Sequence, residues 1–115
     1  MDMEKLNLEL YECRFCSHNI TKKDVTYETD TVLVIDAKTR YVPVHYIIVP
    51  KKHISQTDMF TESNINTFME LNDIIKLFFK NGCRIIINMG ESSGQIEDHL
   101  HIHIFGGCQM RALGL

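Results

Sequence analysis

The residues best suited to carry out chemistry lie in one short stretch, in which three histidines alternate with branched apolar residues. The stretch reads His99-Leu100-His101-Ile102-His103-Ile104-Phe105-Gly106-Gly107. Successive side chains of a β-strand point to opposite faces of a sheet, so the alternation predicts histidines on one face and apolar residues on the other. Imidazole serves as a nucleophile, a proton carrier near neutral pH or a metal ligand. We therefore expect a solvent-reachable chemical site on the histidine face and core on the opposite face.

Two other interpretations of this stretch stay open on the residues alone. The histidines can be chance polar residues on a strand face, or two or three of them can form a pure metal site. The strict alternation favours a functional site over chance. No Asp or Glu pair joins the histidines at ligand spacing, which argues against a hydrolytic two-metal site.

A further pair of candidate ligands is the CxxC formed by Cys13 and Cys16. This spacing lets two thiolates bind one zinc ion in a tight turn. A redox pair uses the same spacing, but no strand-then-helix pattern surrounds these cysteines as it does in a thioredoxin-like site. Metal binding is therefore the better interpretation of the pair.

Composition and charge exclude several classes of protein. The 115 residues suffice for one modest core, so we expect a single domain over residues 1–115. Twelve Lys and Arg against fifteen Asp and Glu give a net charge of −3, without the basic surplus that binds nucleic acid non-specifically. No segment approaches the run of about 18 apolar residues that spans a membrane, and the first ten residues do not resemble a signal peptide. These features predict a soluble, cytoplasmic protein.

Hydrophobic patterning predicts five strands and one long helix. The strands are two runs of a hairpin within residues 25–37, residues 43–50, residues 84–89 and the histidine stretch. The helix covers residues 61–80, begins at the capping Thr61, and carries Ile65, Phe68, Leu71, Ile75 and Phe78 at helical spacing. The run Ile85-Ile86-Ile87 is typical of a strand buried on both faces. This order predicts an α+β fold, a mostly antiparallel sheet with the helix packed on one face.

Several polar features lie at the ends of these elements. His45 stands near the start of the strand of residues 43–50, and His53 follows its exit. Asp36 ends the hairpin, where a carboxylate commonly bonds turn amides. Residues 90–95 form a polar, glycine-bounded loop; such loops offer backbone amides to a phosphate, although most are simply turns.

The order of these features resembles the histidine triad (HIT) superfamily over nearly the whole chain. With φ standing for an apolar residue, the pattern His-φ-His-φ-His-φ-φ matches the family signature. It follows Pro50-Lys51-Lys52-His53-Ile54-Ser55, a long helix, Asn88 and Gly94-Gln95 in the family's order. Gly106-Gly107, followed by Gln109-Met110, is similar to the branch of histidine triad nucleotide-binding proteins, the purine nucleoside phosphoramidases.

The resemblance implies a homodimer that binds purine mononucleotides and cleaves nucleoside phosphoramidates at the α-phosphorus. His101 would be the nucleophile, flanked by His103 and His99, and His45 would support the triad from the neighbouring strand. The nucleotide-binding residues implied by the resemblance are Asp36 at the ribose, and Asn88, Gly94, Gln95, His101 and His103 toward the phosphate and leaving group. The transfer would pass through a nucleotidyl-histidine and would require no metal ion.

Some relatives bind a structural zinc ion, and the resemblance assigns its ligands here to Cys13, Cys16, His53 and His99. Such a closed Cys2His2 set would pin the amino-terminal segment to the sheet. His99 would then be structural and would not contact phosphate.

The chain departs from the family pattern at three places. Ile96 and Glu97 follow Gln95 where the family usually has a hydroxyl residue that reaches the phosphate. The segment between Asp36 and His45 is longer than usual, and residues 111–115 lack the aromatic and proline ending of close relatives. Two alternatives to an enzyme therefore stay open: a catalytically weak nucleotide-binding regulatory module, and a zinc-stabilised interaction protein.

Overall fold

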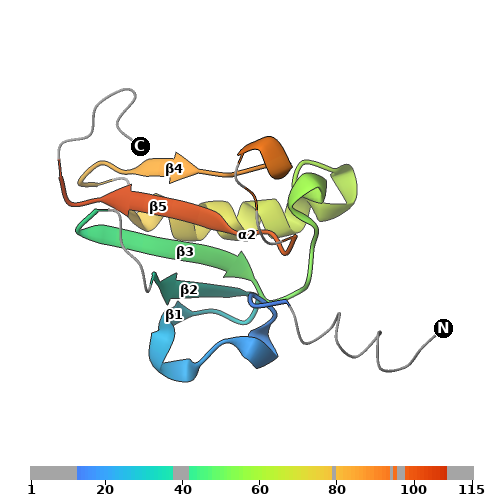
Figure 1. Ribbon diagram of the computed structural model, residues 1–115, viewed down its shortest axis with the longest axis horizontal. Coiled ribbons are helices and arrows are strands. Elements are labelled where there is room, and N and C mark those ends of the chain that lie inside the picture. Colours follow the sequence, from blue (N-terminus) through green and yellow to red (C-terminus); the bar gives the residue numbers. More distant parts are fainter. Residues whose placement is uncertain (1–12, 38–41, 79, 94, 96–97, 109–115) are drawn as a thin grey trace.

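A computed structural model describes residues 13–37, 42–78, 80–93, 95 and 98–108 (Figure 1). Within these residues, five strands form one sheet in the order β1-β2-β3-β5-β4, and all neighbouring pairs are antiparallel. The strands are β1 (Val25–Glu28), β2 (Val32–Asp36), β3 (Val44–Pro50), β4 (Arg84–Ile86) and β5 (Ile102–Gly106). Helix α2 (Ile65–Ile75) crosses one face of the sheet, which confirms the predicted α+β fold.

The long helical segment is less regular than its sequence pattern predicts. A 3-10 turn, η4 (Glu62–Asn64), precedes α2, and another, η5 (Lys76–Phe78), follows it. Helix α2 buries Leu71, Ile74 and Ile75, but Ile65 is 57% exposed, so its assignment to the buried stripe was wrong. Ile65 precedes Leu71 by six positions, which at about 100° per residue places the two roughly 120° apart around the helix.

Both faces of the sheet are covered. On the helix side, Leu100, Ile102 and Ile104 are almost completely buried with the helix residues, as predicted for the apolar half of the histidine stretch. On the other side, Phe15 packs in a second core cluster with strand residues Leu33, Ile35 and Val49. Ile47 pairs with His103 in the ladder, so the histidines face this second cluster.

Strand β4 lies at one edge of the sheet, where β5 is its neighbour. Ile85 is 41% exposed there. The prediction that this strand is buried on both faces was wrong, because an edge strand lacks a second neighbour to cover its side chains. Among the described residues, no helix is long and apolar enough to cross a membrane.

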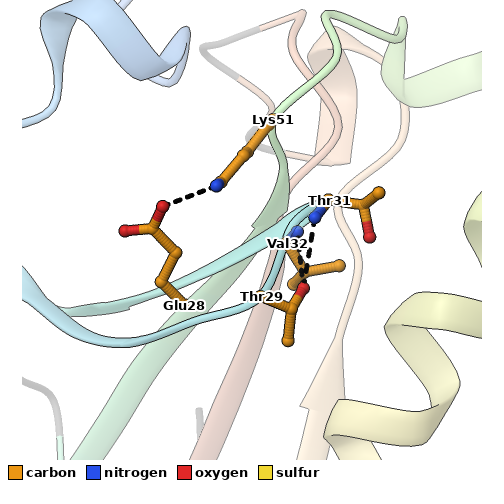
Figure 2. A network of polar contacts seen from close by, with 5 residues as sticks. All are labelled: Glu28, Thr29, Thr31, Val32 and Lys51. Carbon is orange, nitrogen blue, oxygen red and sulfur yellow. Dashed lines mark hydrogen bonds and ion pairs between the residues drawn. The ribbon is translucent and has the colours of Figure 1, made fainter.

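Polar contacts at the β1–β2 turn hold the exit of β3 in place (Figure 2). The Thr29 hydroxyl oxygen accepts hydrogen bonds from the backbone N–H groups of Thr31 and Val32, at 3.3 and 2.9 Å. Lys51, the first residue after β3, forms an ion pair with Glu28, and its backbone N–H donates to the Thr31 carbonyl at 2.8 Å. The turn thereby fixes the segment that leads to His53.

The remaining described elements are short 3-10 turns that link the strands. They are η1 (Ser17–Asn19), η2 (Lys22–Asp24), η3 (Gln56–Asp58) and η6 (Glu91–Ser93). Before β5, the segment that carries His99 pairs with the segment before η3: the N–H of Leu100 donates to the Ile54 carbonyl at 2.6 Å. His99 and His101 therefore precede the ladder of β5 and are held by this local pairing.

Candidate active site and metal centre

Cys13, Cys16, His53 and His99 converge on one point, and their potential ligand atoms all lie within 4.8 Å of one another. The Cys13 sulfur is 3.4 Å from His53 Nδ1 and 3.5 Å from His99 Nδ1. The Cys16 sulfur is 3.3 and 3.6 Å from the same two nitrogens. Residues from the amino-terminal loop, the exit of β3 and the approach to β5 thus meet in one cluster that can hold a metal ion.

The spacing of these atoms fits tetrahedral coordination. Metal–sulfur bonds of about 2.3 Å and metal–nitrogen bonds of about 2.05 Å at tetrahedral angles place sulfur and nitrogen roughly 3.5 Å apart. The four sulfur–nitrogen distances of the cluster, 3.3 to 3.6 Å, agree with that value. Burial, and then the neighbouring Cys13 thiol, raise the pKa of Cys16 to about 11. Without a metal ion Cys16 therefore keeps its proton at neutral pH, and a bound cation would have to displace that proton.

Each ring nitrogen of His99 contacts a polar group. Its Nε2–H donates to the Pro50 carbonyl at 2.8 Å, which leaves the Nδ1 lone pair facing the two sulfurs. The residue is completely buried, and burial lowers the pKa of its ring. The neutral tautomer with a free Nδ1 is the form that binds a metal ion. The structure therefore places the His99 ring with the metal ligands.

His101 is held in one orientation from several sides. Its Nδ1–H donates to the His99 carbonyl at 2.8 Å, so in the neutral ring the lone pair that can act as a nucleophile lies on Nε2. The Phe15 ring stacks on the His101 ring, with centroids 4.7 Å apart and planes 28° from parallel. His101 is only 4% exposed, so the predicted solvent-reachable histidine face is wrong for this residue. The amino-terminal loop that carries Phe15 covers it.

His45 and His103 form a second imidazole pair beside His101. His45 Nε2 lies 3.0 Å from His103 Nδ1, and the His103 ring meets the His101 ring edge to face at 5.5 Å. Burial, and then the neighbouring His101 and His45, lower the pKa of His103 to about 4. His103 is therefore neutral at pH 7. Strand β3 thus brings His45 into contact with His103 of the triad.

Outside the triad, the residues expected to bind the nucleotide are Asp36, Asn88, Gly94 and Gln95, and the structure describes three of these four. Asp36 ends β2 opposite Tyr46, and Asn88 follows β4. The Gln95 side chain closes its own loop, because its Oε1 accepts a hydrogen bond from the Gly90 N–H at 2.6 Å. Gly94, and the departures at Ile96 and Glu97, lie outside the described residues.

The HIT domain family model matches residues 19–110 of this chain. The chain belongs to the HIT family. An uncharacterized HIT-like protein of Chlamydia muridarum is 37% identical over 89 residues, which cover 73% of this chain and 71% of the relative. A HIT family hydrolase from Clostridium thermocellum is 28% identical, with a TM-score of 0.75 over 90% of this chain and 94% of that one. A histidine triad protein from Clostridium difficile is also 28% identical, with a TM-score of 0.73 over 96% of both chains.

Sequence reasoning missed Gln56, the residue that ties the HIT triad to the rest of the fold. Gln56 is completely buried in η3. Its Oε1 accepts the His101 N–H at 2.8 Å, and its Nε2 donates to the carbonyls of His101 at 3.2 Å and Asn88 at 2.9 Å. The Gln56 side chain thus bonds both the N–H and the carbonyl of His101, as a neighbouring strand would do. Its position directly after the His53 segment was the available signal, but a lone glutamine has no periodic pattern.

The lowered pKa of His103 predicts that this HIT protein loses stability in mild acid. The unfolded chain takes up the proton near the ordinary pKa of 6.5, whereas the folded chain takes it up near 4. The unfolded state therefore binds more protons between these values, and stability falls as the pH is lowered from 6.5 to 4. We expect a loss of about 2 to 3 kcal/mol from this group. Urea unfolding at a series of pH values measures it.

Two variants test whether His103 causes the loss of stability in acid. His103→Asn should lessen the dependence on pH between 6.5 and 4, leaving the part that comes from His99, whereas His18→Asn, at an exposed histidine in η1, should leave the native dependence unchanged. Equal slopes in the native protein and His103→Asn would contradict the assignment of the effect to His103.

Proposed function

We propose that this HIT protein is a hydrolase that cleaves purine nucleoside phosphoramidates, or related nucleoside monophosphate derivatives, at the α-phosphorus. The observation that carries the proposal is the fixed tautomer of His101. Its Nδ1–H is committed to the His99 carbonyl, so in the neutral ring Nε2 is the nitrogen without a proton and can act as the nucleophile. The HIT family hydrolase from Clostridium thermocellum, with its similar fold, supports the reaction class.

The proposed reaction has two steps. His101 Nε2 attacks the α-phosphorus, a bond forms between nitrogen and phosphorus, and the phosphorus–nitrogen bond of the substrate breaks. The leaving amine takes up a proton from solvent as it departs, and the water that attacks in the second step gives up its protons to solvent. Water then attacks the phosphorus of the nucleotidyl-histidine, which releases the nucleoside monophosphate and restores the neutral imidazole. No step is assigned to a metal ion.

The neighbouring imidazoles supply hydrogen bonds in this scheme. His45 Nε2–H donates to His103 Nδ1 across their 3.0 Å contact. The proton of neutral His103 then resides on Nε2, from which it is donated to a phosphoryl oxygen and stabilises the charge that develops there. We assign Asp36 to the ribose hydroxyls, and Asn88 and Gln95 to the phosphate and leaving group; Gly94, which the resemblance also assigns there, lies outside the described residues. His99 contributes its carbonyl, while its ring belongs to the metal set.

The direct test is incubation of the native protein with adenosine or guanosine 5′-phosphoramidate. We expect release of the nucleoside monophosphate and of ammonia in equal amounts. Binding of the mononucleotide without turnover would contradict the hydrolase and favour the nucleotide-binding module. Absence of nucleotide binding, with a tightly held metal ion, would favour the zinc-stabilised interaction protein.

We further propose that the ion in the Cys2His2 cluster is zinc. Two thiolates and two imidazoles in tetrahedral array are the donor set that zinc prefers for closed structural sites, and no ligand position is left for substrate. The ion would stabilise the amino-terminal loop and take no part in the chemistry. The free thiols fit a reducing compartment, and we propose that the protein, folded as one domain, acts in the cytoplasm.

We also propose that two copies pair through the edge strand β4. Ile85 on this strand and Leu77 in η5 are large apolar side chains, 41% and 65% exposed. An uncovered edge strand with apolar side chains is a template for pairing with another copy. Sedimentation equilibrium should give a dimer for the native protein and a monomer for Ile85→Lys. Phe60→Lys, at a residue 68% exposed before the helix, should stay dimeric; a monomeric native protein would contradict the pairing.

A further inference from the structure

The loop that carries the two cysteines also covers the proposed nucleophile. Phe15 lies between Cys13 and Cys16, and its ring stacks on His101 at 4.7 Å. It is 7% exposed and packs with Leu33, Ile35 and Val49 of β2 and β3. A residue within the CxxC therefore contacts a histidine 86 positions later in the sequence.

The Phe15 ring lies against a face of the imidazole and not against its edge. The planes of Phe15 and His101 are 28° from parallel, so the phenyl ring covers the flat side of the imidazole. The lone pair of Nε2 lies in the plane of the imidazole ring and points away from its edge. Phe15 therefore opposes tilting of the ring without standing on the line along which Nε2 attacks phosphorus. The low exposure of His101 therefore arises in part from the ring that covers its flat side.

The loop that carries Phe15 also carries two of the four candidate metal ligands. Within the loop, the Cys16 N–H donates to the Cys13 carbonyl at 3.3 Å and Asn19 Nδ2 donates to the same carbonyl at 2.7 Å. The sulfur atoms on either side of Phe15 meet His53 and His99, which come from other parts of the chain. An ion bound by all four would fix both ends of the four-residue span from Cys13 to Cys16, which contains Phe15. The His99 carbonyl also accepts a hydrogen bond from His101 Nδ1–H. An ion in the cluster would therefore be linked to His101 in two ways, through Phe15 and through His99.

We propose that Phe15 is a positioning residue for His101, and that the metal-bound Cys13–Cys16 loop sets its position. The inference rests on the proposed function only for its kinetic consequence. Its structural content is that the geometry of the metal site controls the stacking of Phe15 on His101. The ion would thereby affect the nucleophile without touching substrate.

The structural arm of the test uses NMR of protein labelled in its histidine rings. Stacking by Phe15 should move the His101 ring resonances upfield through the ring current, and Phe15→Leu should remove that shift. Exchange of zinc for cadmium keeps the four ligands but lengthens the bonds, so it displaces the loop without emptying the site. We expect the His101 resonances to change on this exchange in the native protein and to stay unchanged in Phe15→Leu. Equal responses in both proteins would overturn the link between metal and nucleophile.

The kinetic arm separates positioning from substrate binding. A misplaced nucleophile can cost about 100-fold in rate, so we expect Phe15→Leu to lower kcat roughly 10- to 100-fold with KM within about twofold of native. Phe15→Tyr keeps the ring and should restore most of kcat. Phe60→Leu, at a phenylalanine whose ring contacts Phe68, is the matched control and should leave both constants unchanged. A raised KM at unchanged kcat would overturn the positioning role.

The two arms also separate this inference from the proposed function. A native protein without turnover contradicts the hydrolase, while the NMR comparison still decides whether the metal loop holds Phe15 on His101. If the native protein turns over substrate but Phe15→Leu retains native kcat, the positioning role is wrong and the hydrolase stands.

Discussion

His101→Ala is expected to abolish turnover of a purine nucleoside phosphoramidate, with a loss in kcat of at least roughly 10³-fold. The reason is that the substitution removes the one nitrogen that the proposed reaction uses to attack phosphorus. Mononucleotide binding should be largely retained, because the other donors and the apolar surroundings stay in place. Release of the nucleoside monophosphate under steady-state conditions, together with calorimetric binding of the mononucleotide, measures the two effects.

The matched control for this substitution is His18→Ala. His18 is an exposed histidine in η1 and lies outside the triad and the metal cluster. It should keep native kcat and KM. Residual activity of His101→Ala within tenfold of native would show that the phosphorus is attacked by another group.

Loss of the metal ion is expected to be the largest single effect on stability. Cys16→Ser removes one of four ligands, and the loop of residues 13–16 then depends on the packing of Phe15 and a few turn hydrogen bonds. Closed structural zinc sites contribute their binding free energy directly to folding, so we expect a loss of at least about 3 kcal/mol in the free energy of unfolding. Metal content per chain and urea unfolding measure the change.

Cys108→Ser provides the comparison for this variant. Cys108 is an exposed free cysteine and does not belong to the metal cluster, so its replacement should change neither metal content nor stability. Chelation of the native protein should reproduce the destabilisation seen in Cys16→Ser and should have no further effect on that variant. Equal metal content in native protein and Cys16→Ser would remove Cys16 from the ligand set.

The parts of this fold that follow from local pattern could be predicted from the sequence. Alternation placed Leu100, Ile102 and Ile104 in the core, where the structure finds them. The β-branched runs indicated the five strands, because strand preference is a property of neighbouring residues, although β4 ends at Ile86 and β5 begins only at Ile102. The metal cluster of Cys13, Cys16, His53 and His99 followed from the family resemblance, and their ligand atoms meet in the structure.

The features that sequence reasoning missed depend on contacts between distant segments. Burial of His101 comes from Phe15, and its backbone partner comes from Gln56, 45 positions away. Exposure of Ile85 depends on β4 being the last strand of the sheet, which the apolar run Ile85-Ile86-Ile87 does not encode. A periodic pattern identifies which side of an element is apolar, but the neighbour that covers it is decided by the tertiary fold.

The most direct test of the account is detection of the covalent intermediate. The native protein is mixed with adenosine 5′-phosphoramidate, quenched without acid within the first turnovers, digested and analysed by mass spectrometry. We expect an adenylyl group on the peptide that contains His101, located on that histidine by fragmentation and missing from His101→Ala. Adenosine monophosphate produced at the native rate with no adduct on His101, or with the adduct on another residue, would contradict the central claim.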